Sequence, residues 1–133
     1  MIDPMPEPFR LSDQNIIGFV ATSDPERAKA FYRDTLGLPL VSDQLPFALV
    51  FDIHGIMLRV TAVKQVNPQP YTILGWGVAD IATAAAEMSM AGVKFERFPG
   101  LEQDANGVWS APGGAKVAWF KDPDGNTLSI SQH

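Results

Sequence analysis

The sequence contains one pattern twice: an apolar strand, an aspartate-capped helix, a glycine and three further strand-like segments. The two helices follow Asp24 and Asp80 and end at Gly37 and Gly92, which gives a repeat of about 55 residues. One helix can cover only one face of a sheet built from about four strands. If the two copies turn their free faces toward each other, they enclose a groove, so the repeat predicts a pocket.

The first copy starts with an apolar, β-branched segment that is typical of a strand, IIGFVATS at 16–23. Asp24-Pro25-Glu26 then provides an N-cap, a proline at the first helical position and an acidic residue at the positive end of the helix dipole. Apolar residues at helical spacing predict a helix over 24–36, which Gly37 ends. Three strands are expected next, with a tight turn at His54-Gly55 between the last two; they lie near 38–43, 47–53 and 56–63.

The second copy follows a proline-containing linker, NPQP at 67–70. Its helix is capped by Asp80, and its strands are expected at 71–78, 93–98, 115–121 and 126–132. An insertion at 99–114 is predicted to form a loop in which Trp109 folds onto an apolar surface. We therefore expect an α+β fold: a flexible extension at 1–14, then a single domain at 15–133 made of two βαβββ modules, about 15–64 and 71–133.

Composition narrows the possible functions. The formal net charge is −5, which argues against nucleic acid as a partner because phosphates favour a basic surface. The absence of cysteine excludes disulfides, thiolate nucleophiles and cysteine zinc sites. No apolar segment has the length of a membrane span, so we expect no membrane partner and a cytoplasmic location.

Three stretches and the repeat resemble the vicinal oxygen chelate superfamily: SDPERAKAFYRDTLGL (23–38), ADIATAAAEMSMAGVKF (79–95) and WFKDPDGNTLSI (119–130). This superfamily includes glyoxalases, extradiol dioxygenases, fosfomycin-resistance enzymes and bleomycin-binding proteins. The resemblance implies paired curved sheets around a groove, as in glyoxalase and bleomycin-resistance proteins. Members commonly pair, so it also implies a homodimer.

In the metal-dependent members, the resemblance places four ligands on the groove side of four strands. The matching positions carry no strong donor for a divalent ion: they are Ile17, Thr61, Ile73 and Ser129. The only two histidines, His54 in a hairpin turn and His133 at the C-terminus, lie outside these strands. We therefore expect neither a bound metal nor another cofactor.

Strand alternation predicts which side chains line the groove. Leu128 and Ile130 are expected in the core, while Ser129 on the last strand and Arg59 and Thr61 on the fourth are expected to face the groove. Arg59 is a candidate anchor for a carboxylate or phosphate, because an unpaired buried arginine is costly. The alternatives are an ion pair with Glu102 or Asp104, or a surface side chain.

Aromatic residues complete the predicted ligand-binding set. Phe19, Tyr71 and Trp109 are candidates for the apolar wall beside Arg59, Thr61 and Ser129, whereas Trp76 and Trp119 are interpreted as core or dimer contacts. No Ser-His-Asp set, paired carboxylates or phosphate-binding glycine loop is recognisable, so no catalytic residue is assigned.

The first hypothesis is thus a glyoxalase/bleomycin-resistance-like protein that binds a small organic molecule without the usual metal. The alternative is a metal-dependent lyase or dioxygenase of the same superfamily with unorthodox ligands, and whether the protein is an enzyme stays open.

Overall fold

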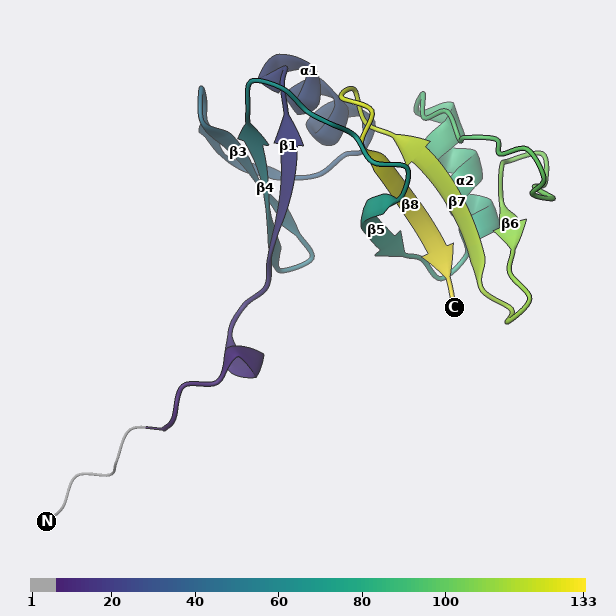
Figure 1. The fold of residues 1–133 in the computed structure, drawn as a ribbon, viewed down its shortest axis with the longest axis horizontal. Helices are drawn as coiled ribbons and strands as arrows, with labels where there is room; N and C mark the ends of the chain where they lie inside the picture. The colour runs from purple at the N-terminus through teal and green to yellow at the C-terminus, as the bar shows by residue number, and fades with distance from the viewer. Residues whose placement is uncertain (1–6) are drawn as a thin grey trace, which may run out of the picture.

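The computed structural model describes residues 7–133 and contains two four-stranded sheets, each with its own helix (Figure 1). Sheet A has the strand order β1-β4-β3-β2 and sheet B the order β5-β8-β7-β6. The expected α+β fold of two repeated modules is confirmed. None of the helices within 7–133 is long and apolar enough to cross a membrane.

Sheet A combines one parallel and two antiparallel strand pairs: β1 (Ile17–Thr22) runs parallel to β4 (Ile56–Ala62), which pairs with β3 (Ala48–Ile53), and β3 pairs with β2 (Leu40–Gln44). At the β3–β4 turn, His54 and Gly55 have φ values of 50° and 89°. Two consecutive positive φ angles are typical of the type I′ hairpin turn, which matches the twist of the strands.

The first helix consists of α1 (Pro25–Lys29) and a π-helical continuation, η2 (Ala30–Thr35). The side chain of Asp24 accepts a hydrogen bond of 3.2 Å from the Arg27 N–H, and Gly37 follows the helix with φ of 73°. The predicted helix over 24–36 is therefore confirmed, and its ends lie where the capping residues indicate.

Sheet B contains β5 (Thr72–Gly77), β6 (Trp109–Ser110), β7 (Lys116–Lys121) and β8 (Thr127–Gln132), with α2 (Ile81–Met90) packed against β7 and β8. Asp80 caps α2 by accepting a hydrogen bond from the Thr83 N–H. Figure 1 shows α2 behind the sheet, so one face of sheet B is covered by the helix.

The expected strand over 93–98 is wrong. This segment forms only one bridge, between Phe95 and Phe120, and β6 from the insertion becomes the fourth strand. The side chain of Gln103 takes the place of a neighbouring strand: it accepts from the Phe98 N–H and donates to the Glu96 carbonyl, both at 2.8 Å. Because a side-chain amide satisfies this backbone, no ladder is needed there.

The hydrophobic core lies on the helix side of both sheets and is continuous between the modules. Phe31 of the first helix lies 6.5 Å from Phe120 of β7 between ring centroids. The side chains that point from the strands into this core include Leu49, Phe51, Leu58, Val60, Ala118, Phe120, Leu128 and Ile130. The opposite face of each sheet, called here the open face, is not covered by any helix of residues 7–133 (Figure 1).

The β7–β8 turn, which contains the sequence DPDGN, connects the second module to the first. Asp122 is only 5% exposed and accepts hydrogen bonds from the Tyr32 hydroxyl at 2.7 Å and from the Asn126 and Asp124 N–H groups. The side-chain amide of Asn126 donates both to Asp122 and to the Ala21 carbonyl. The buried carboxylate thus fixes the turn and the first helix to each other.

Asp124 makes a second connection at the surface. It accepts hydrogen bonds from the Thr22 hydroxyl at 2.6 Å and from the Ser23 N–H and hydroxyl at 2.8 and 2.7 Å. Burial by itself would raise the pKa of Asp124, but these hydrogen bonds outweigh it and the pKa lies below its ordinary value. Through Asp122 and Asp124, the motif sets the position of sheet B relative to α1.

Candidate small-molecule site on the second sheet

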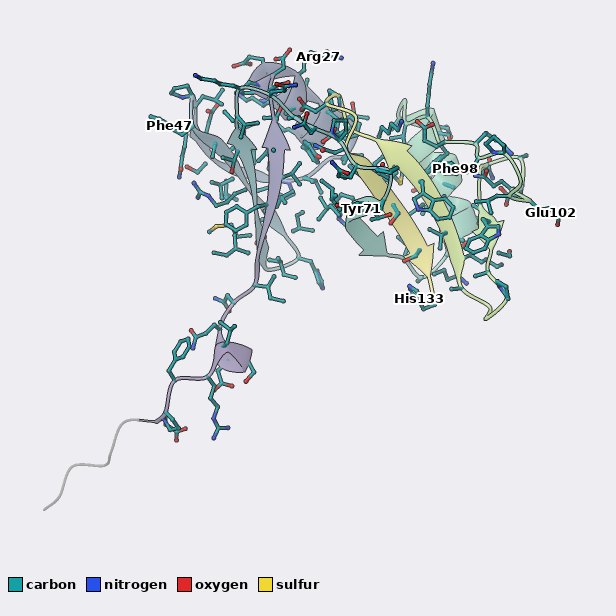
Figure 2. The ribbon with its side chains drawn as sticks, viewed as in Figure 1. Arg27, Phe47, Tyr71, Phe98, Glu102 and His133 are labelled. Carbon is teal, nitrogen blue, oxygen red and sulfur yellow. The ribbon has the colours of Figure 1, made fainter. Side chains whose placement is uncertain are left out.

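The open face of sheet B is built by the residues that alternate with the core positions of β7 and β8. Leu128 and Ile130 lie in the core, as predicted, so Thr127 and Ser129 lie on the open face, and the strand register places Trp119 opposite Ser129 and Lys121 opposite Thr127. Figure 2 shows the labelled side chains of Tyr71 and Phe98 on this same side of the sheet, away from α2.

A pocket of about 560 Å³ occupies the end of this open face that lies next to the DPDGN turn. Its walls come from the 67–70 linker, the start of β5, the segment after α2, and the two ends of the β7–β8 hairpin. The residues that line it are Pro68, Gln69, Pro70, Tyr71, Thr72, Glu96, Phe98, Leu101, Trp119, Lys121, Gly125 and Thr127.

Trp119 forms the centre of the aromatic wall, and its neighbours fix its orientation. Phe98 meets it edge-on, with ring centroids 5.4 Å apart and planes at 88°, and Trp109 packs on it at 5.9 Å and 34°. Such contacts restrict the rotamers of the indole ring. The pocket therefore presents a pre-positioned aromatic surface.

The linker is fixed to the same end of the sheet. The Thr127 hydroxyl donates to the Gln69 carbonyl at 3.2 Å. Gly125 has φ of 88°, and a Cβ atom there would lie 3.3 Å from Cγ of Pro68. A glycine at this turn thus permits both the positive φ and the close approach of the linker.

Two charged side chains line the pocket, Lys121 and Glu96. The ion pairs formed among residues 7–133 are Lys29–Asp43 and Arg33–Asp34, so neither Lys121 nor Glu96 has a partner in that part of the chain. An ammonium and a carboxylate are therefore both available to a ligand, beside a mainly apolar wall.

Of the six predicted ligand-binding residues, the structure places Tyr71 in the lining of this pocket. Trp109 packs against Trp119 from the neighbouring strand and lines a separate, polar hollow of about 630 Å³ with Glu102 and Asp104. Ser129 is buried on the open face beside Gly75, where an added Cβ atom would lie 2.9 Å from the serine Oγ.

The other three predicted residues lie on the open face of sheet A, outside the pocket lining. Phe19 and Arg59 are directly opposite each other on β1 and β4, and Thr61 lies two residues further along β4. Arg59 donates to the Gln44 side-chain oxygen at 3.2 Å, so the proposed ion pair with Glu102 or Asp104 is absent from the described structure.

The positions that would carry the ligands of a divalent ion do not fit one. Ile17 and Thr61 lie on sheet A, Ile73 and Ser129 on sheet B, and their hydrocarbon and hydroxyl groups cannot replace the water shell of the ion. Within residues 7–133, no three His, Asp or Glu side chains gather closely enough to hold a metal ion.

Several residues of the pocket are missing from the sequence-based prediction. Trp119 was interpreted as a core or dimer contact, although its register opposite Ser129 would have placed it on the open face. Glu96 and Phe98 were not predicted as pocket residues, because a regular strand was expected over 93–98. The same alternation would have placed Lys121 on the open face, but it does not predict that Lys121 lies close to the linker.

A second cavity, of about 410 Å³, lies on the helix side where the two modules meet. Leu36 and Leu38 of the first module face Trp76 and Met88 of the second. Trp76 also stacks on Phe120, at 6.3 Å. This tryptophan is therefore separated from the pocket by the thickness of sheet B, whereas Trp119 forms part of its wall.

Two βαβββ modules that share a helix-side core and leave one face of each sheet open define a protein of the vicinal oxygen chelate fold. Residues 15–130 match the model of the Glyoxalase/Bleomycin resistance protein/Dioxygenase superfamily, and the chain belongs to this superfamily. A comparison with curated protein sequences finds no significant match.

Solved structures share the fold at low sequence identity. A glyoxalase/bleomycin resistance protein/dioxygenase from Nocardioides is 17% identical with a TM-score of 0.67, over 97% of this chain and 85% of its own. A glyoxalase/bleomycin resistance protein from Catenulispora acidiphila is 20% identical with a TM-score of 0.64, over 90% and 97%. Lactoylglutathione lyase from Agrobacterium tumefaciens is 18% identical with a TM-score of 0.64, over 90% and 93%.

Proposed function

We propose that this protein binds a small organic molecule with an aromatic or otherwise apolar body in the pocket on the open face of sheet B, without the divalent ion of the metal-dependent members. The observation that carries the proposal is the arrangement of Trp119, Phe98 and Tyr71 around a space of about 560 Å³. That volume falls within the range of ligand pockets, roughly 300–1,000 Å³.

The polar groups of the pocket support a ligand that also carries charge or hydrogen-bonding groups. Lys121 offers an ammonium and Glu96 a carboxylate, and neither is paired within residues 7–133. In a largely apolar pocket, a few such groups fix the orientation of a ligand whose rings stack on the aromatic wall.

The three tryptophans allow a direct test. In a spectrum of the indole N–H groups, each signal is assigned by replacing one tryptophan with phenylalanine. We expect an aromatic carboxylate or amine from a small panel to shift the Trp119 signal strongly. The Trp109 signal should shift less, because Trp109 packs on Trp119, and the Trp76 signal should not change.

A matched pair of variants gives the control. Trp119→Ala should weaken binding at least about tenfold, because losing a stacked aromatic contact costs about 1.4 kcal/mol or more of binding free energy. Trp76→Phe, on the far side of sheet B, should bind normally. Shifts that follow Trp76 instead of Trp119 would refute the assignment of the pocket.

A metal-dependent lyase or dioxygenase with unorthodox ligands is the competing outcome. Stoichiometric Ni, Zn, Fe or Mn that stays with the purified protein through dialysis would favour it over the metal-free binding protein. The donor chemistry of Ile17, Thr61, Ile73 and Ser129 supports the binding protein.

We further propose a cytoplasmic homodimer. The cysteine-free composition supports the compartment, because a reducing environment gives no role to disulfides. The resemblance to superfamily members that pair supports the dimer, and light scattering of the purified chain tests it.

A further inference from the structure

The cavity of about 410 Å³ on the helix side, called here the inter-module cavity, has walls from both halves of the chain. The end of the first helix and the segment after it, at 35–38, form one wall, and the end of β5 and the last turn of α2 form the other. Its volume falls within the range of small-molecule pockets, roughly 300–1,000 Å³. Sheet B separates it from the pocket around Trp119, so a molecule bound here would occupy a different site.

The surface of the inter-module cavity is mainly aliphatic. Leu36, Leu38 and Met88 pack against the core with part of each side chain, while the rest stays uncovered. The two aromatic rings, Trp76 and Phe120, already stack on each other with planes 23° apart. They leave no slot between them for a third ring, so the cavity suits a compact aliphatic body better than an aromatic one.

Glu87 is the one charged side chain among the described residues that line the cavity. It is also the only charged residue of α2, so no lysine or arginine of its own helix can neutralise it. The ion pairs formed within residues 7–133 are Lys29–Asp43 and Arg33–Asp34, which leaves the Glu87 carboxylate unpaired there. A carboxylate beside an apolar cavity favours a ligand that carries a positive charge.

Both helices end at the cavity, and their ends have the same sign as Glu87. Thr35 is the last residue of η2, while Met88 and Ala91 belong to the last turn of α2 and its C-cap. The last carbonyl groups of a helix lack partners within it and give this end a partial negative charge. α2 has no basic side chain in its last turn, and the arginine near the end of the first helix is paired with its neighbour, Asp34. The electrostatic potential at the cavity thus favours a cation.

We propose that the inter-module cavity binds an aliphatic ammonium ion, an amine whose compact hydrocarbon body fills the apolar space and whose charged group lies beside Glu87. The uncovered part of the Trp76 ring can stabilise the same charge by a cation–π contact. The site goes beyond the binding function proposed above, because it lies on the other side of sheet B and takes a different class of ligand. Since such a ligand touches both modules, its binding also stabilises the folded arrangement of the two.

Adamantylamine is a suitable probe, because its cage is compact and saturated and its amine is protonated at pH 7. At millimolar concentrations we expect it to shift the indole N–H signal of Trp76 and to leave the Trp119 signal unchanged. Adamantanecarboxylate has the same cage with the opposite charge, and it should bind at least about tenfold more weakly. Equal affinities for the two probes, an unchanged Trp76 signal, or a shift of Trp119 instead of Trp76 would overturn the proposal.

Two matched pairs of variants locate the probe. Glu87→Gln removes the charge but keeps the size, and should raise the dissociation constant of adamantylamine about three- to fivefold, the effect of an exposed ion pair. Glu102→Gln makes the same change in net charge beside β6, at the opposite edge of sheet B from β5, and should have no effect.

The second pair changes the space in the cavity. Ala91→Leu places a larger side chain in its wall and should weaken binding of adamantylamine at least about tenfold. Ala86→Leu, at an exposed position of α2 outside the cavity lining, should bind normally. Unchanged affinity in Glu87→Gln or in Ala91→Leu would overturn the assignment of the probe to this cavity.

Each site is read at its own tryptophan, Trp76 for the inter-module cavity and Trp119 for the pocket on the open face. If this inference fails, Trp76 does not respond to adamantylamine while Trp119 still responds to aromatic ligands. If the proposed function fails, the pattern is the reverse, so the two failures are distinguishable.

Discussion

The hydrogen bond from Tyr32 to Asp122 offers the sharpest test of how the two modules are joined. Tyr32 is fully buried, and its hydroxyl donates to a carboxylate that is itself buried, at 2.7 Å. Tyr32→Phe removes this one donor and keeps the ring, while the backbone N–H groups of Asp124 and Asn126 and the Asn126 amide still bind Asp122. The substitution therefore isolates the contact between modules.

The expected loss follows from the charge of the acceptor. Hydrogen bonds to charged groups contribute about 1.5–3 kcal/mol to the free energy of unfolding. For a chain of this length, each kcal/mol corresponds to about 3–5 °C, so Tyr32→Phe should lower the melting temperature by about 5–15 °C. Asp122→Ala should cost more, about 3–5 kcal/mol, because it leaves several buried donors without an acceptor.

Thermal and urea unfolding measure both variants, with Tyr71→Phe as the control. Tyr71 is exposed, and its hydroxyl makes no hydrogen bond within the described chain, so its loss should stay within about 0.5 kcal/mol. If Tyr32→Phe also cost less than about 0.5 kcal/mol, this hydrogen bond would not help to hold the modules together, and the reasoning about Asp122 would be wrong.

The same hydroxyl gives a dependence on high pH. Burial, and next the neighbouring charge of Asp122, hold the pKa of Tyr32 well above its ordinary value. The unfolded chain releases this proton near pH 10 and the folded chain does not, so the stability from Tyr32 is complete below about pH 10 and falls as the pH rises above it. Tyr32→Phe should remove this part of the decline.

Three further predictions follow from single sites. Because the folded pKa of Asp124 is lowered, its contribution to stability is present above the unfolded pKa of about 3.9 and is lost as the pH falls below it. Asp124→Asn should therefore flatten the acid side of the curve of stability against pH. An unchanged curve would contradict the role of Asp124 as a stabilising carboxylate. In urea unfolding, Gly107→Ala should destabilise the fold by about 1–3 kcal/mol more than Gly100→Ala. Both glycines have φ near 87°, but only at Gly107 would the added Cβ atom meet another atom, the Cβ of Phe95 at 2.9 Å. Trp119→Ala should move the ligand-induced shift of the Trp109 indole signal to a ligand concentration at least about tenfold higher, and a shift at an unchanged concentration would place the ligand elsewhere.

Local sequence signals predicted the elements whose ends are set by neighbouring residues. Asp24 and Asp80 cap helices because a short side-chain oxygen reaches the N–H of the third residue after it. Gly37 ends the first helix and His54-Gly55 forms a hairpin turn, because each position needs a positive φ. The repeat of these signals was enough to predict two modules of the same kind.

The prediction of a strand over 93–98 was wrong because the group that binds this backbone comes from a later part of the chain. Its composition permits a strand, but the Gln103 side chain satisfies the backbone at Glu96 and Phe98 and allows β6 to take the fourth place in the sheet. No pattern within 93–98 signals a side chain that arrives from a later loop.

The candidate site was predicted only in part. Alternation places residues on one face of a strand, which correctly separated Leu128 and Ile130 from the open face of β8. It does not say how far along that face a ligand pocket lies, nor which loop covers it. Tyr71 lines the pocket, while Arg59 belongs to the other sheet and Trp109 packs against Trp119 from outside the pocket lining.

The sequence by itself determined the two-module fold, because periodicity and capping are properties of single residues and their near neighbours. It also shows that the four positions matching the ligands of the metal-dependent members carry isoleucine, threonine and serine. Only the tertiary structure decided where the pocket lies. A linker, a loop after α2 and the β7–β8 hairpin meet there across distances in sequence that no local rule spans, and the turn that completes the pocket is held in place by Tyr32, about 90 residues earlier in the chain.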